Sequence, residues 1–173
     1  MIIIRKAMQN DLYSIAVVHV ESIRTSYRDI MPDDYLDNLS YEEKYKNWEI
    51  RLFTEACKEF MFVAECTENG VIGFSAANIE KTNDLFEREL NTIYLLKEFQ
   101  RKGIGELLFK KVVSEFRKHD IKSMMLWTLK ENPARYFYEY LGGEVFDSKM
   151  IDRGGKQLVS IAYGWKDLTL FDS

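Results

Sequence analysis

The first feature of this sequence that could do chemistry is a pair of glycines after a short polar and basic run. The segment "QRKGIG" consists of Gln100, Arg101, Lys102, Gly103, Ile104 and Gly105. The apolar run before it indicates a strand and the apolar spacing after it indicates a helix, so the glycines stand where the helix begins. The first turn of a helix leaves about four backbone N–H groups without partners and carries roughly half a positive charge. Such a junction suits an anion, and a pyrophosphate would fit it.

Two better-known phosphate loops do not fit this segment. A Walker loop needs the pattern G-x-x-x-x-G-K-[ST], which the sequence lacks. The dinucleotide fingerprint needs a third glycine at the position where Leu108 stands. By itself, a bare G-x-G is equally consistent with an ordinary tight turn beside a solvated basic stretch.

A second polar group follows the next apolar run. Asn132 precedes Pro133, which is a capping residue followed by a favoured first-turn residue, and Tyr138 lies on the helix that they predict. Both residues also have a purely structural interpretation. Asn132 would cap a helix in any protein, and Tyr138 falls on an apolar stripe where a core aromatic is usual.

Length and composition restrict the class of protein. At 173 residues and 46% hydrophobic content, the chain is expected to form one domain over residues 1–173. A net charge of −4 disfavours nucleic acid as a partner. With no apolar run of about 20 residues and only four apolar residues before Arg5, we expect no membrane partner and a cytoplasmic location. The two cysteines lack zinc spacing, so no metal site is expected.

The pattern of the whole chain predicts one mixed sheet with helices on its faces. Strands are predicted at 1–7, 60–66, 71–80, 87–96, 122–129 and on both sides of a Gly154-Gly155 turn. Helices are predicted at 10–27, 31–40, 41–53, 104–119 and 133–143. The segment "ENG" between the second and third strands is a good hairpin signal.

The two motifs together resemble the GNAT family of acyl-CoA-dependent N-acetyltransferases. Its Q/R-x-x-G-x-G/A signature is matched by Gln100, Gly103 and Gly105, and "ENPARYFYEYLGG" follows at the expected distance. The resemblance covers nearly the whole chain. It implies an α/β fold with a mixed, mostly antiparallel sheet of six to seven strands flanked by helices, in which one strand pair splays apart at the acyl-CoA site. Acetyl-CoA would be the acyl donor.

The resemblance also implies which residues bind the donor. The splayed strand would offer backbone groups to the pantetheine arm, and the glycine loop would wrap the pyrophosphate. The expected acetyl-CoA site comprises Ile93, Tyr94, Leu95, Gln100, Arg101, Lys102, Gly103, Ile104, Gly105, Glu106, Asn132, Arg135 and Tyr138.

The implied reaction is attack of a neutral amine on the thioester. Glu89 is the candidate general base, directly or through a water molecule, and strand alternation would place it on one face with Asn91, Ile93 and Leu95. A surface carboxylate at a strand end is the alternative interpretation. Tyr138 is the candidate acid that protonates the leaving thiolate, and the Leu95 N–H would stabilise the oxyanion.

The acceptor site would lie between the first helices and the last hairpin. The candidate acceptor-binding residues are Tyr27, Tyr35, Asn91 and Trp127, with Asp33, Asp34 and Tyr41 nearby. Another branch of the family carries its base where Trp127 stands, which disfavours N-terminal amines as acceptors. The sequence leaves three classes of acceptor open: a small amine, an aminoglycoside-type compound and a protein lysine. A homodimer is also expected. The alternative function is a non-catalytic acyl-CoA sensor or scaffold.

Overall fold

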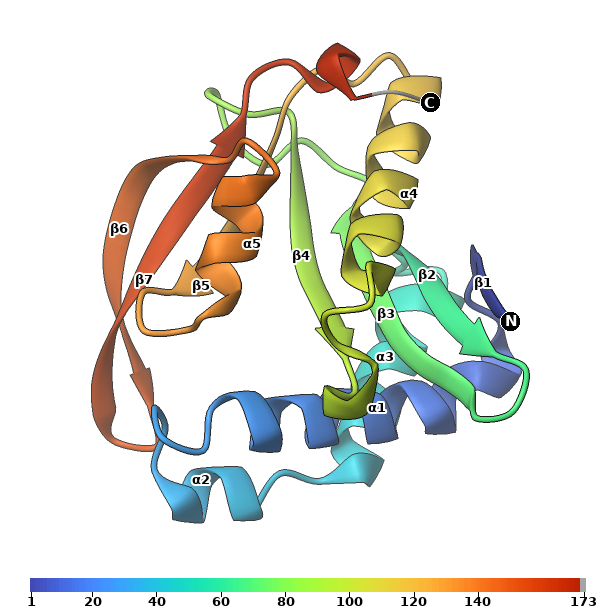
Figure 1. Cartoon of the computed structure of the whole chain (residues 1–173), viewed down its shortest axis with the longest axis vertical. Coiled ribbons are helices and arrows are strands. Elements are labelled where there is room, and N and C mark those ends of the chain that lie inside the picture. Colours follow the sequence, from blue (N-terminus) through green and yellow to red (C-terminus); the bar gives the residue numbers. More distant parts are fainter. Residues whose placement is uncertain (172–173) are drawn as a thin grey trace.

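One seven-stranded sheet forms the centre of the structure, a computed structural model that describes residues 1–171 (Figure 1). The strand order is β1-β2-β3-β4-β5-β7-β6, and every neighbouring pair is antiparallel except β4 and β5. The strands are β1 Ile2–Lys6, β2 Glu59–Cys66, β3 Gly70–Asn78, β4 Arg88–Leu95, β5 Met124–Leu129, β6 Glu144–Arg153 and β7 Lys156–Trp165. The predicted mixed, mostly antiparallel sheet is confirmed.

Helices cover both faces of this sheet (Figure 1). They are α1 Leu12–Ser26, α2 Asp33–Asp37, α3 Tyr41–Phe53, α4 Ile104–Lys118 and α5 Ala134–Tyr140, with short 3-10 turns η1 Gln9–Asp11, η2 Lys97–Phe99 and η3 Leu168–Leu170. Helix α5 lies within the predicted range 133–143 and ends before Gly142, because the chain turns at this glycine, whose φ is 83°. None of the helices in residues 1–171 is long and apolar enough to cross a membrane.

The two faces of the sheet carry separate apolar cores. Along β2, Phe62 and Ala64 join the core beneath α4 and α5, whereas Met61 and Val63 join the core beneath α1 and α3. Because both faces are covered, such strands appear in the sequence as near-continuous apolar runs rather than alternating ones.

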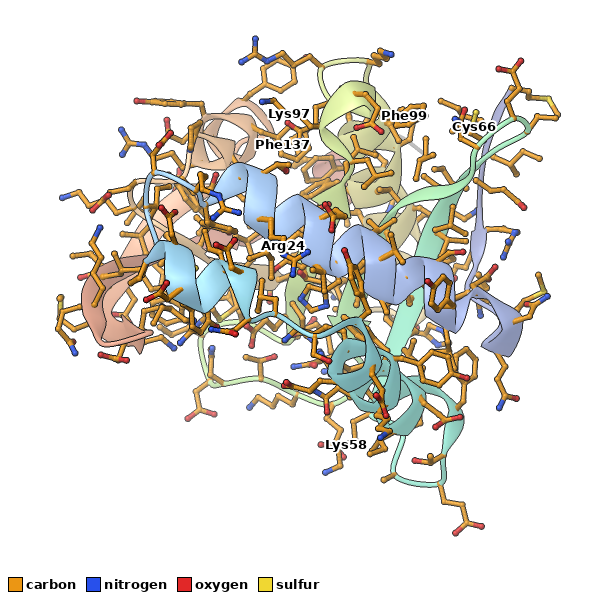
Figure 2. The ribbon with its side chains drawn as sticks, turned by 90° about the horizontal axis from the view of Figure 1, so that it is seen from below. Arg24, Lys58, Cys66, Lys97, Phe99 and Phe137 are labelled. Carbon is orange, nitrogen blue, oxygen red and sulfur yellow. The ribbon has the colours of Figure 1, made fainter. Side chains whose placement is uncertain are left out.

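Arg24 binds the backbone at the end of α2 through hydrogen bonds. Its side chain lies between α1 and α2 (Figure 2) and donates hydrogen bonds to the carbonyl groups of Leu36, Asp37 and Leu39. Carbonyl groups at a helix end lack partners within the helix, so a guanidinium group stabilises them effectively. The end of α2 is therefore held against α1.

Strands β4 and β5 separate soon after they meet (Figure 1). They pair only at Arg88 with Met124 and at Glu89 with Met125. Beyond these pairs β4 stays with β3, while β5 stays with β7 along its whole length. The predicted splayed strand pair is thus present.

A bulge in β4 accompanies this separation. Ala76 of β3 is opposite Thr92 and the next residue, Ala77, is opposite Leu90, so Asn91 is an extra residue in β4. A bulge bends its strand and increases the local twist. The bend occurs two residues after the last pair with β5.

The bulge also changes which side chains share a face. Leu90, Ile93 and Leu95 all pack with the α4 core, so the residue before Leu90, Glu89, points to the opposite face. The expectation that Glu89 shares a face with Ile93 and Leu95 is therefore wrong. Strand alternation cannot predict faces across an inserted residue.

We predict that Gly73→Ala destabilises the protein. A Cβ atom at Gly73 would lie 2.6 Å from Cδ1 of Leu95 and 2.8 Å from the backbone oxygen of Tyr94, so the end of β4 would have to move. Overpacking of this kind costs about 1–3 kcal/mol. Urea unfolding measures the change, with Ser148→Ala on the exposed edge strand β6 as the control. Equal stability of the two variants would contradict the prediction.

Candidate active site

A cleft of about 660 Å³ opens where β4 and β5 separate. Its walls come from α1, β4, the loop before α4, β5 and the start of α5. Most of the predicted site residues line it, namely Tyr27, Asn91, Ile93, Tyr94, Leu95, Gln100, Arg101, Gly103, Gly105, Glu106, Trp127, Asn132 and Tyr138. Five others do not line it: Tyr35, Glu89, Lys102, Ile104 and Arg135.

The glycine loop leaves the first turn of α4 open to a ligand. Gly103 is the residue before the helix, has a φ of 79° and forms no side-chain cap. A left-handed φ favours glycine, and a Cβ atom there would meet nothing within 4 Å. Without a capping side chain, the amides of the first turn stay free to bind an anion. Ile104 is buried in the core, so only its backbone can serve such a ligand.

Gln100 and Phe137 hold this loop in place. The side-chain amide of Gln100 donates a hydrogen bond to the backbone oxygen of Leu95 at 3.0 Å, which ties the loop to the end of β4. The ring of Phe137 lies 3.5 Å from the Cβ position of Gly105, so α5 packs on the first turn of α4. Figure 2 shows Phe137 on the same side of the molecule as Lys97 and Phe99 of η2.

Asn132, after β5, and Tyr27, after α1, join two walls of the cleft. Asn132 is buried, accepts a hydrogen bond from the N–H of Ala134 and donates one to the Tyr27 hydroxyl at 3.0 Å. The asparagine is therefore both a helix cap and part of the cleft wall. Burial raises the pKa of Tyr27, so its hydroxyl keeps the hydrogen that it can donate into the cleft.

Tyr138 presents a protonated phenol to the same cleft. Its ring packs against Phe137, Tyr163 and Trp165, and the side chain is only 8% exposed. None of the hydrogen bonds formed within residues 1–171 involves its hydroxyl group. Burial raises the pKa of Tyr138, so the phenol is neutral at physiological pH and can donate a proton.

Glu89 lies outside the cleft lining, on the face of the sheet that α1 covers. Its side chain is half-buried, and this burial raises its pKa, an effect that the positive charge of Lys149 partly offsets. A carboxylate with a raised pKa is a stronger base than an exposed one. From this position the Glu89 side chain does not line the cleft.

Three other predicted residues also lie outside the cleft lining. Tyr35 packs against the β6–β7 turn, 2.7 Å from the Cβ position of Gly154. Arg135 stacks on the ring of Tyr136, 4.6 Å from its centroid. The ammonium group of Lys102 is 5.4 Å from the centroid of the Phe99 ring.

Three polar residues of α1 that sequence reasoning missed also line the cleft. They are Ser22, Thr25 and Ser26, and the buried Ser22 hydroxyl has no hydrogen-bond partner within residues 1–171. The available signal was their place on the otherwise apolar face of a predicted helix. No cluster of three His, Cys, Asp or Glu side chains in residues 1–171 could hold a metal ion.

His19 positions the cleft residue Tyr94 from behind, a role that the sequence did not indicate. The His19 ring stacks on the Tyr94 ring at 4.8 Å, and its Nδ1 accepts a hydrogen bond from Nε1 of Trp48 at 2.9 Å. Burial, with the nearby charges of Lys44 and Arg51, lowers the pKa of His19 to about 3. The imidazole is therefore neutral, as an acceptor from an indole N–H must be.

Known proteins with similar sequences are acetyltransferases by family or by name. The model of the Acetyltransferase (GNAT) family matches residues 20–142. The chain is 34% identical over 170 residues to the uncharacterized N-acetyltransferase YuaI of Bacillus subtilis, covering 98% of this chain and 95% of that one. It is 25% identical over 144 residues to a spermidine N(1)-acetyltransferase of Thermoplasma acidophilum, covering 81% of this chain and 86% of the relative.

Solved structures show the same fold. The PaiA N-acetyltransferase from Thermoplasma acidophilum, in complex with coenzyme A, superposes with a TM-score of 0.70 at 24% identity, covering 96% of this chain and 99% of that one. YncA from Salmonella typhimurium, with acetyl-CoA, gives a TM-score of 0.70 at 17% identity and covers 96% and 94%.

We predict that the free energy of unfolding of His19→Gln falls less than that of the wild type as the pH is lowered into the mildly acidic range. Below pH 6.5 the unfolded chain protonates this histidine, whereas the folded chain does not until about pH 3, so the wild-type free energy of unfolding falls as the pH falls. Between pH 6.5 and pH 5 this change in the free energy of unfolding is about 1.6 kcal/mol. Urea unfolding at several pH values measures it, and His119→Gln, on an exposed side chain, is the matched control. Parallel curves for wild type and His19→Gln would contradict the assignment.

Proposed function

The chain belongs to the acetyltransferase (GNAT) family, and we propose that it transfers an acetyl group from acetyl-CoA to a primary amine by direct attack on the thioester. One observation carries this proposal: the same cleft joins an uncapped helix N-terminus, which suits a pyrophosphate, to a buried and protonated phenol, which suits a leaving thiolate. The relatives named as N-acetyltransferases, and the neighbours solved with coenzyme A or acetyl-CoA, support acetyl-CoA as the donor.

The donor would bind along β4 and the glycine loop. Because β4 pairs with β5 only at its first two residues, later backbone groups on that edge could hydrogen-bond the amides of a pantetheine arm, while the Leu95 oxygen there already accepts a hydrogen bond from Gln100. The amides from Gly103 to Glu106 would hold the pyrophosphate, and Arg101 and Lys102 would add positive charge.

The direction of the backbone supports Leu95 as the oxyanion donor. The N–H of Leu96 donates to the carbonyl of Ile72 on β3. Successive N–H groups of a strand point to opposite edges, so the N–H of Leu95 points to the open edge. An N–H in that direction can meet the oxygen that becomes negative during the reaction.

The proposed reaction moves one proton away from the attacking amine and supplies one proton to the leaving thiolate. The neutral amine attacks the carbonyl carbon, a C–N bond forms, and a water-linked Glu89 accepts a proton from the nitrogen. Collapse of the oxyanion breaks the C–S bond, and Tyr138 gives its proton to the thiolate. The products are the acetamide and the free thiol of coenzyme A.

Three narrower points stay predictions. The acceptor would enter between α1, α2 and the β6–β7 hairpin, near Tyr27, Tyr35, Asn91 and Trp127. A cytoplasmic location and a homodimer stay predictions as well, and the sheet edges β1 and β6 would be the strands available for pairing two chains.

We predict that Tyr138→Phe lowers kcat about 10²-fold, because the thiolate would leave without a proton donor. Thiol release at saturating acetyl-CoA measures kcat, and calorimetry should show unchanged binding of acetyl-CoA. Tyr136→Phe on the same helix, where the tyrosine is 59% exposed, is the matched control. An unchanged kcat would remove Tyr138 from the mechanism, and binding without thiol release by wild type across an amine panel would favour an acyl-CoA sensor.

We predict that Glu89→Gln lowers kcat/KM for the amine about 10²-fold and removes the limb on the acid side of the pH profile. The wild-type rate should rise as Glu89 loses its proton, at a pH above the ordinary range of a glutamate, because burial raises its pKa. Steady-state rates across pH measure this, with the exposed Glu80→Gln as control. The same acid limb in wild type and Glu89→Gln would exclude Glu89 as the base.

A further inference from the structure

An ammonium group of this chain lies on the ring of a tryptophan that lines the cleft. Nζ of Lys149, on β6, is 3.9 Å from the centroid of the Trp127 ring, on β5. Among aromatic side chains, the indole face attracts cations most strongly. The Trp127 ring therefore holds a cation beside the cleft, and that cation is the ammonium group of Lys149.

The register of three strands brings the two side chains together. Lys149 is opposite Ser160 of β7, and Ser160 is opposite Leu129 of β5, two residues along from Trp127 and on the same face. Trp127 itself is opposite Ala162. Because Ser160 and Ala162 are small, the lysine side chain can cross β7 and reach the ring.

No carboxylate among residues 1–171 lies close enough to this ammonium group to form an ion pair, although Glu89 interacts with its charge at longer range. Within residues 1–171 Lys149 forms no ion pair, and the side chain of Asp147 on the same strand accepts a hydrogen bond from the N–H of Ser148 instead. The charge of Lys149 nevertheless acts on the interior, since it lowers the pKa of Glu89 against the effect of burial. A second cation near Trp127 would meet the positive charge of Lys149 at short range, where no ion pair holds that charge.

We propose that Lys149 is a specificity-determining residue, whose ammonium occupies the cation site on Trp127 and thereby selects primary amines with a neutral or anionic far end over amines with a second positive charge. The inference rests on the proposed acetyl transfer. Lys149 would act in two ways: it occupies the Trp127 ring that could otherwise attract the second cation of an acceptor, and its charge repels that cation. Together these effects would discriminate between acceptors of similar shape and different charge. A carboxylate at the far end of the acceptor would instead pair with Lys149.

Three primary amines with six carbons each test this proposal: 6-aminohexanoate, hexylamine and 1,6-diaminohexane. We expect kcat/KM of the wild type to fall in that order. In Lys149→Met the ratio of diamine to hexylamine should rise roughly tenfold, because the ring becomes free and the repulsion disappears. Lys149→Arg should keep the wild-type order, and Lys118→Met, at the exposed end of α4, should leave all ratios unchanged.

An equilibrium measurement accompanies the kinetics. Calorimetric titration of 1,6-diaminohexane into the protein with coenzyme A should show tighter binding to Lys149→Met than to wild type. If the wild type acetylates these amines but Lys149→Met changes neither the kcat/KM ratios nor the affinity for the diamine, the inference about Lys149 is overturned and the proposed function is not. Absence of thiol release by wild type with all three amines would overturn the proposed function, and the inference with it.

Discussion

The separation of two parallel strands is the constraint on which the rest of the site depends. Strands β4 and β5 share only two residue pairs, after which each keeps one partner and exposes one unpaired backbone edge to the interior. Unpaired backbone groups are costly in a dry core, so the space between them has to meet water or a ligand with complementary polar groups. A chain with its own amides, such as the pantetheine arm of acetyl-CoA, satisfies that requirement as a further strand would.

Contacts at the far ends of the cleft keep it open. The Gln100 side chain ties the glycine loop to Leu95, and the hydrogen bond from Asn132 to Tyr27 joins residues 105 apart in the sequence. Behind β4, the neutral His19 ring stacks on Tyr94. Each contact satisfies a polar group or packs an aromatic ring, and together they hold the walls in the positions that binding requires.

One physical effect, burial, prepares both partners of the proposed proton transfers. It raises the pKa of Tyr138, so the acid keeps its proton until the thiolate forms, and it raises the pKa of Glu89, so the base is stronger. The charge of Lys149 moderates the second shift. The same lysine would therefore adjust the base and, through Trp127, select the acceptor.

The sequence by itself determined the features that depend on neighbours along the chain. Local patterns predict the glycine loop, the cap at Asn132 and the order of strands and helices. The resemblance to the family adds the residues expected to bind the donor. The bulge at Asn91, the bond between Tyr27 and Asn132, and the contact of Lys149 with Trp127 were decided only by the tertiary structure. They depend on strand register and on contacts between distant segments, which no local pattern encodes because one inserted residue exchanges the faces of a strand.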